Sequence, residues 1–231
     1  MGIFVGIPSS RLTSPTAKLL YKLNRIVCRM LFRVRKPELT PLPATGPAIL
    51  VSDHTSLGDP LVLLATAGRP IVFLMAEEIY VRPSIAWVFR ALHCVPVRRG
   101  TLDIKSVRAM VKALADGEVV GIFPEGGIDR YRDAAGYAGV GYLALKSGAP
   151  VVPASVRWDK PRPLTIYGTL LIPCPARVVY GRPLVFPRMD RPTSRRAREA
   201  TDRIMEAIAA LRGAGDGSSG IQAEAVPSMR S

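Results

Sequence analysis

Two spacings of apolar residues alternate along the chain. Short continuous apolar runs predict buried strands, while apolar positions three or four apart predict amphipathic helices. Strands are predicted at 48–52, 71–75, 94–97, 118–123, 151–156, 164–171 and 176–180. Helices are predicted from Pro60 onward and over 84–91, 103–115, 140–146 and 193–211. Strands that alternate with helices are typical of an α/β fold.

The first amphipathic segment, residues 17–36, carries only basic charges. Its apolar positions are Leu19, Leu20, Leu23, Ile26, Val27, Met30, Leu31 and Val34, and Lys18, Lys22, Arg25, Arg29 and Arg33 fall between them. No Asp or Glu precedes Glu38. Such a basic amphipathic helix is typical of segments that lie on a membrane surface. The alternative is a helix that packs on the core and turns its polar face to solvent.

Four prolines between residues 37 and 47 separate this segment from the remainder of the chain. We therefore divide the sequence into a membrane-association segment at 1–43, one globular domain at 44–212, and a tail at 213–231. The tail is rich in Gly, Ser and Ala and is expected to be disordered. No stretch reaches the roughly 18 consecutive apolar residues of a transmembrane helix.

The charge balance predicts an anionic partner. Lys and Arg number 32 against 18 Asp and Glu, which gives a net charge of +14 and a pI near 10.3. Phospholipid head groups, phosphorylated substrates and nucleic acid all satisfy this charge. An aromatic content of 6% and the lack of a recognisable binding module argue against nucleic acid. We predict an anionic membrane surface and no nucleic acid, with a basic nucleic-acid-binding protein as the alternative of another class.

The three cysteines are widely spaced, odd in number and without a C-x-x-C pair, which favours a reducing compartment. Together with the basic first segment, this predicts a peripheral protein on the cytoplasmic face of the cell membrane. No His and Cys cluster has metal-ligand spacing, so neither a metal nor another cofactor is expected.

His54 is the better candidate of only two histidines for proton transfer. It follows a predicted strand, and Asp59 comes five residues later. A carboxylate that curls back to one ring nitrogen would leave the other nitrogen free to take a proton from a hydroxyl. Alternatively, Asp59 is only the N-cap of the helix at Pro60. His93, beside Cys94, is predicted to be a core or edge histidine.

Four short blocks in chain order resemble the glycerolipid acyltransferase family, of the lysophosphatidic acid acyltransferase type. His54 to Asp59 is similar to its H-x-x-x-x-D motif, including Ser56. Residues 95–100, 123–126 and 151–154 look like its second, third and fourth blocks. The resemblance covers residues 44–156, and four ordered blocks are far more specific than any one of them.

This resemblance implies a twisted mixed sheet flanked by helices, with the site loops at one edge near the bilayer. It also implies an acyl transfer from acyl-CoA or acyl-carrier protein to a lysophospholipid hydroxyl, most simply converting 1-acyl-glycerol-3-phosphate to phosphatidate. His54 would be the general base and Asp59 would stabilise its imidazolium. Arg99, Glu125, Gly126 and Arg130 are expected at the substrate phosphate, and Pro153 in the acyl-donor or acyl-chain region.

The third block departs from the family pattern. The family usually continues Thr-Arg-Ser, whereas this chain has Gly127, Ile128 and Asp129. The arginine commonly tied to the substrate phosphate is therefore replaced, which keeps a second acceptor class open, another lysolipid or a glycolipid. Asp53 stands where asparagine is common before the histidine.

Overall fold

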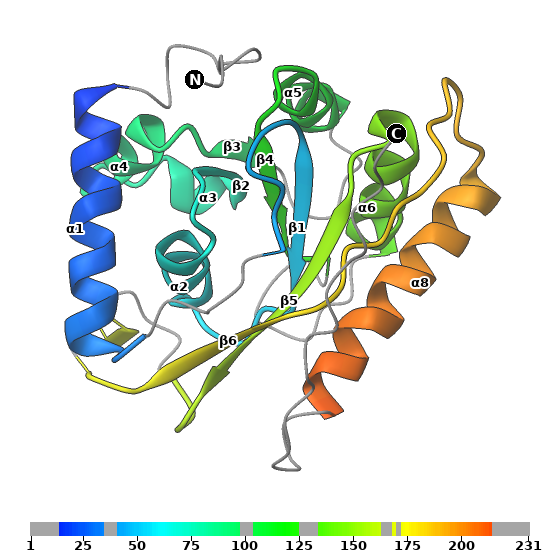
Figure 1. The fold of residues 1–231 in the computed structure, drawn as a ribbon. Helices are drawn as coiled ribbons and strands as arrows, with labels where there is room; N and C mark the ends of the chain where they lie inside the picture. The colour runs from blue at the N-terminus through cyan, green and yellow to red at the C-terminus, as the bar shows by residue number, and fades with distance from the viewer. Residues whose placement is uncertain are drawn as a thin grey trace, which may run out of the picture.

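The computed structural model describes residues 14–34, 41–97, 104–124, 134–162, 168–169 and 172–213. Its centre is a six-stranded sheet with helices on both faces (Figure 1). The strands are β1 (Ala48–Ser52), β2 (Ile71–Ala76), β3 (Val95–Val97), β4 (Val119–Ile122), β5 (Val151–Trp158) and β6 (Ala176–Tyr180). Their order is β3-β2-β4-β1-β5-β6, and only β6 runs antiparallel to its neighbour. The predicted α/β fold with a mixed sheet is confirmed.

The helices form the two outer layers. They are α1 (Pro15–Leu31), α2 (Asp59–Thr66), α3 (Glu77–Tyr80), α4 (Ala86–Ala91), α5 (Ile104–Ala115), α6 (Ala134–Ser147) and α8 (Ser194–Gly213). Figure 1 shows α1 and α2 on one side of the sheet and α5, α6 and α8 on the other. The short helix α3 was not predicted, and α6 begins six residues earlier than its spacing indicated. Of the predicted strand at 164–171, only residues 168 and 169 are described, and their backbone is helical.

Strand β1 shows why the sheet is buried on both faces. All five of its residues are buried, as expected for a parallel strand covered by helices on both sides. Because successive side chains point to opposite faces, Leu50 packs in the core under α1 and α2. Ile49 and Val51 pack in the core under α5, α6 and α8.

Helix α1 is capped at its N-terminus and packed along one side. Ser14 caps it by accepting a hydrogen bond from the Ala17 amide at 3.1 Å. Asn24 donates from Nδ2 to the Leu61 carbonyl of α2 at 2.9 Å, and Cys28 is fully buried. Helix α1 therefore packs on the body of the protein through one of its faces. Among the described helices, none is long and apolar enough to cross a membrane.

Helices α6 and α8 approach closely because Gly141 has no side chain. A Cβ at Gly141 would collide with the carbonyl oxygen of Ala197 on α8. The Gly141 amide donates instead to Thr201 Oγ1 at 3.2 Å, and Thr201 is completely buried. Gly139 lies two residues earlier on α6, and no atom is within 4 Å of the position that a Cβ would take there.

This contrast predicts opposite effects for two glycine substitutions in one helix. Gly141→Ala should lower the free energy of unfolding by about 1–2 kcal/mol, because overpacking against backbone outweighs the gain in helix propensity. Gly139→Ala should leave stability unchanged or raise it by up to about 1 kcal/mol. Denaturant unfolding of both variants checks this. Equal effects of the two substitutions would contradict the close α6 and α8 contact.

Candidate active site

Three parallel strands bring the site together at their carboxyl ends. Strand β1 lies between β4 and β5 and is parallel to both, so the three carboxyl ends share one edge of the sheet. His54 follows β1, Phe123 follows β4, and Trp158 is the last residue of β5. Phe123 and Trp158 both pack against the core under α1 and α2. The site is therefore built on that face.

Asp59 is a fully buried carboxylate whose partners are in the loop before it. It is the first residue of α2, and its Oδ2 accepts hydrogen bonds from the amides of Thr55 and Ser56 at 2.7 Å each. His54 Nδ1 donates to the same oxygen at 3.1 Å. The N-cap of α2 is Gly58, with no side-chain capping bond. The alternative reading of Asp59 as a mere N-cap is therefore wrong, since its carboxylate orients the loop and the imidazole.

The His54 ring is fixed by stacking as well as by Asp59. Its centroid lies 4.2 Å from that of Phe123 with an interplanar angle of 20°, and Phe73 stacks behind Phe123 at 5.5 Å. Phe73 can lie there because a side chain on Gly121 would collide with its ring. The His54 side chain is 14% exposed. A neutral imidazole that donates from Nδ1 carries its lone pair on Nε2, so this ring can accept a proton there.

Asp53 points to the opposite face from His54. Its Oδ2 accepts from Ser155 Oγ at 3.2 Å and from Arg212 Nε at 2.9 Å, and Arg212 is in the last turn of α8. Ser52 Oγ donates to Oδ1 at 3.2 Å. Asp53 therefore ties the end of β1 to β5 and to α8. The sequence drew attention to Asp53, but its ion pair with a residue 159 positions away follows only from the fold.

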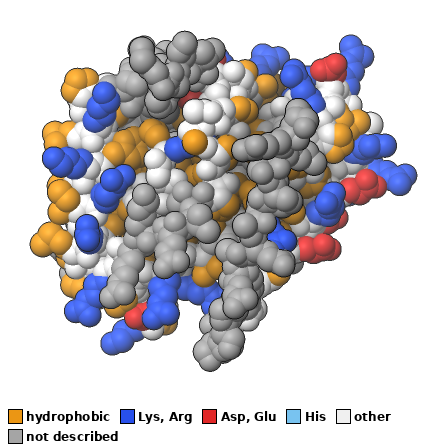
Figure 2. Space-filling model, in the orientation of Figure 1, with side chains coloured by type: hydrophobic (Ala, Val, Ile, Leu, Met, Phe, Trp, Pro, Cys, Tyr) orange, Lys and Arg blue, Asp and Glu red, His pale blue; other side chains and the backbone are white. Residues whose placement is uncertain are grey.

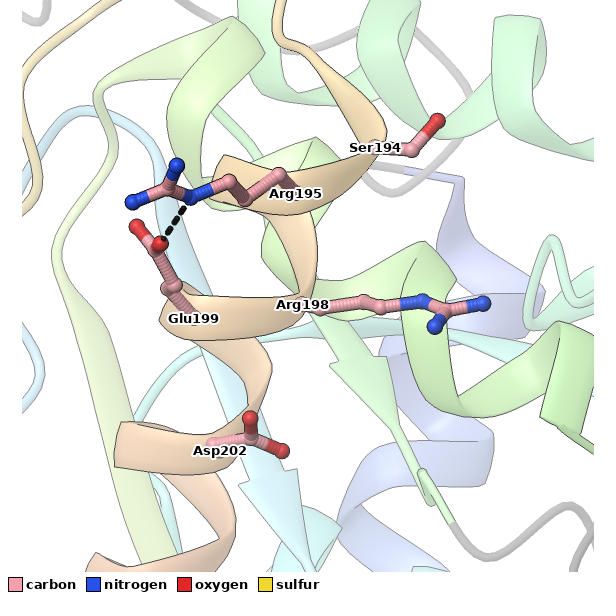
Figure 3. Close-up of a pocket in the computed structure, with 5 residues that line it drawn as sticks. All are labelled: Ser194, Arg195, Arg198, Glu199 and Asp202. Atoms are coloured by element: carbon pink, nitrogen blue, oxygen red, sulfur yellow. Dashed lines mark hydrogen bonds and ion pairs between the residues drawn. The ribbon is translucent and has the colours of Figure 1, made fainter.

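A cavity of about 570 Å³ borders the same loop. It lies between Thr55, the end of β5 and the end of α8, and four basic side chains line it, those of Arg157, Lys160, Arg162 and Arg212. A second hollow, of about 350 Å³, lies on the outer side of α8 alone (Figure 3). Arg195 and Glu199 form an i,i+4 ion pair of 2.9 Å there. We regard this second hollow as an ordinary solvated helix face.

The predicted site residues divide into those that the structure describes and those that it does not. His54 and Asp59 are in contact, as expected from their spacing. Pro153 is buried inside β5, where its carbonyl accepts from the Gly181 amide at 2.8 Å. Its place in the acyl-donor or acyl-chain region stays a prediction. Arg99, Glu125, Gly126 and Arg130 lie outside the described residues.

The cysteines are not arranged as nucleophiles. Burial raises the pKa of both Cys28 and Cys94 to about 12, and Cys174 is also buried. His93, next to Cys94, has a left-handed backbone with φ of 56° in the turn before β3. Across the described part of the chain, no three His, Cys, Asp or Glu side chains lie together as a metal site would require.

Comparison with known proteins identifies the family of this chain. The model of the acyltransferase family matches residues 33–157, which is more than half of the chain and includes both His54 and Asp59. The chain belongs to the acyltransferase family. The resemblance drawn from four sequence blocks is thereby confirmed.

Two curated relatives of this acyltransferase-family chain have the name 1-acyl-sn-glycerol-3-phosphate acyltransferase. The Bacillus subtilis protein is 28% identical over 115 residues, covering 49% of this chain and 57% of the relative. The Borreliella burgdorferi protein is 25% identical over 118 residues, covering 50% of this chain and 47% of the relative. The chain thus matches about half the length of these curated relatives.

The fold is also that of a solved family structure. The Thermotoga maritima 1-acyl-sn-glycerophosphate acyltransferase, PlsC, superposes with a TM-score of 0.58 at 20% identity. The match covers 88% of this chain and 83% of the Thermotoga chain. At this identity the likeness concerns the fold alone.

The cysteine environment leads to a prediction about thiol reagents. Because a pKa of about 12 keeps the thiols of Cys28 and Cys94 protonated below that pH, the native protein should react slowly with iodoacetamide at pH 8. Acyl transfer should survive the treatment. Mass spectrometry after labelling checks this, with guanidinium-unfolded protein as the control in which all three cysteines react. Fast labelling of native Cys94 with parallel loss of transfer would instead indicate a covalent thioester route.

Proposed function

We propose that this protein transfers a fatty acyl group from acyl-CoA or acyl-carrier protein to the hydroxyl of a lysophospholipid. The acceptor that we propose is 1-acyl-glycerol-3-phosphate. The observation that carries the proposal is the buried Asp59 carboxylate bound to Nδ1 of His54 at the carboxyl end of β1. Family membership and the names of the two curated relatives support the same chemistry.

In this mechanism His54 is the general base. Nε2 takes the proton of the acceptor hydroxyl while the hydroxyl oxygen attacks the thioester carbonyl carbon. The new ester C–O bond forms, and the C–S bond breaks when the tetrahedral intermediate collapses. The imidazolium returns its proton to the thiolate sulfur, so that a free thiol leaves. Asp59 stabilises the imidazolium between these steps, and no acyl-enzyme is required.

Recognition of the acceptor is assigned to Arg99 and Arg130, with Glu125 and Gly126 as their neighbours in the sequence. Arg99 follows β3 in the chain, and Arg130 follows the block that contains Glu125 and Gly126. A guanidinium binds phosphate through two parallel hydrogen bonds, which suits these arginines to the lysolipid phosphate. Pro153 belongs to the acyl-donor or acyl-chain region in this proposal.

In this proposal, α1 binds the surface of the membrane that contains the lysolipid. Leu19, Leu23, Ile26 and Met30 are 65%, 52%, 46% and 74% exposed and form a stripe along the side of α1 that faces away from α2. The neighbouring basic residues Lys18, Lys22, Arg25, Arg29 and Arg33 are exposed too. Figure 2 shows hydrophobic and basic side chains intermingled along the edge where α1 lies. An apolar stripe bordered by cations fits the surface of an anionic bilayer, on its cytoplasmic face in this proposal.

The catalytic proposal predicts the effect of removing the base. His54→Ala should lower acyl transfer by about 10²- to 10⁴-fold, and Asp59→Asn should also lose most activity, because each removes one half of the proton-transfer pair. His93→Asn is the matched control, since asparagine tolerates the left-handed backbone at that position. The assay uses labelled acyl-CoA with a panel of 1-acyl-glycerol-3-phosphate, a lyso-aminolipid and a glycolipid.

Two outcomes of this assay count against the proposal. Near wild-type turnover in His54→Ala would remove the mechanism. Transfer only to the unphosphorylated acceptors would keep the mechanism but replace the proposed substrate, as the Ile128 departure allows.

The membrane proposal predicts loss of liposome binding when the stripe becomes acidic. Leu23→Glu with Ile26→Glu should abolish binding to anionic vesicles, because apolar burial is lost and two new carboxylates weaken the attraction to the head groups. Each Lys or Arg near the surface contributes about 1 kcal/mol, which salt weakens. Sedimentation with vesicles at low and high salt measures both parts.

The control has the same change in charge away from α1. Ile104→Glu with Val185→Glu replaces two exposed apolar residues elsewhere on the protein and should leave most binding intact. Equal loss in the two double variants would show that net charge, not the α1 stripe, determines binding.

A further inference from the structure

The geometry points to Trp158 as a positioning residue for the catalytic pair, an inference that rests on the proposed role of His54. The indole Nε1–H of Trp158 donates to Asp59 Oδ1 at 2.7 Å. The two residues are 99 positions apart in the chain. Trp158 lies outside the four family-like blocks, four residues after the end of the last one.

The hydrogen bond completes the coordination of a fully buried carboxylate. Oδ2 of Asp59 already has three donors, namely the Thr55 amide, the Ser56 amide and Nδ1 of His54. For Oδ1, the indole supplies the one hydrogen bond found among the described residues. A buried carboxylate oxygen without a partner is costly, so loss of the indole N–H would favour rotation of the carboxylate or entry of water. Either change would move Oδ2 away from its line with Nδ1.

The indole is itself held in place from several sides. Phe32, just after α1, contacts the ring edge to face with centroids 5.1 Å apart. The guanidinium of Arg162 lies 4.9 Å from the ring centroid, and its Nη1 donates to the Ile172 carbonyl at 2.7 Å. On the catalytic loop, a Cβ at Gly58 would lie 2.7 Å from the indole ring, so glycine permits this close approach.

These contacts give Trp158 a defined task. Because the ring cannot shift easily, its N–H fixes the plane of the Asp59 carboxylate before substrate binds. The fixed carboxylate holds His54 as the tautomer with the proton on Nδ1, which leaves Nε2 as the base. Trp158 does not touch the reacting atoms in this scheme and acts through Asp59.

The decisive experiment removes the N–H and keeps the ring. The chain has two tryptophans, so Trp87→Phe gives a parent in which only Trp158 remains. Trp87 is 55% exposed and is not part of the site, so this parent should keep wild-type activity. Growth with β-(3-benzothienyl)alanine then replaces the indole by an isosteric ring that has sulfur in place of N–H. Trp158→Phe, made with ordinary amino acids, is the simpler second variant.

We expect the isostere to lower kcat for acyl transfer by about tenfold or more, with both KM values within about twofold of the parent. We also expect the ¹⁵N spectrum of the imidazoles to show a smaller fraction of the Nδ1–H tautomer at His54, with His93 unchanged. The melting temperature should stay close to that of the parent. Independently, Asp59→Asn should shift the indole N–H resonance of Trp158 and leave that of Trp87 unaltered.

Several outcomes would overturn the inference. Unchanged kcat and tautomer in the isostere would show that the hydrogen bond serves neither catalysis nor orientation. A fall in kcat with an unchanged His54 tautomer would show that the N–H does not act by orienting His54. An unmoved indole resonance in Asp59→Asn would show that the hydrogen bond to Asp59 is not made. If His54→Ala remained active, the proposed role of His54 as the base would fail instead, while the tautomer measurement would still decide whether Trp158 orients His54.

Discussion

The burial of the Asp59 carboxylate is the constraint on which the candidate active site depends. A fully buried anion is tolerated only when hydrogen-bond donors surround it. The chain supplies these donors from two sources, the Thr55 and Ser56 amides within five residues of Asp59 and the Trp158 indole from a distant strand. Since the loop must turn back to bring its amides to Asp59, it also brings His54 to the same carboxylate. The requirement to solvate one buried charge thereby shapes the loop and orients the imidazole.

The parallel sheet makes that solution possible. Strands β4, β1 and β5 end at one edge, so residues that follow each strand meet although they are far apart in sequence. The alternation of side chains across the sheet then separates two tasks. His54 lies with Phe123 on the face under α1 and α2, whereas Asp53 anchors the strand end to Arg212 of α8. Adjacent residues in the chain thus belong separately to the candidate site and to the scaffold.

Helix α1 combines two surfaces that sequence analysis treated as alternatives. One face packs on α2 through Asn24 and Cys28, and the opposite face presents a stripe of exposed apolar residues. Its C-terminal end also carries Phe32, which touches Trp158. The element proposed to meet the bilayer is therefore in direct contact with the residue proposed to position the catalytic carboxylate.

The sequence by itself determined the α/β class, most element positions and the pairing of His54 with Asp59. These depend on local properties, since hydrophobic periodicity reports which residues are buried, and a five-residue spacing limits how far a loop can travel. The tertiary structure alone decided the strand order and the face of α1 that packs on α2. It alone brought Trp158 to Asp59, Phe123 to the His54 ring and Arg212 to Asp53. Those contacts join residues 69 to 159 positions apart, and no local pattern encodes which distant strand ends will become neighbours.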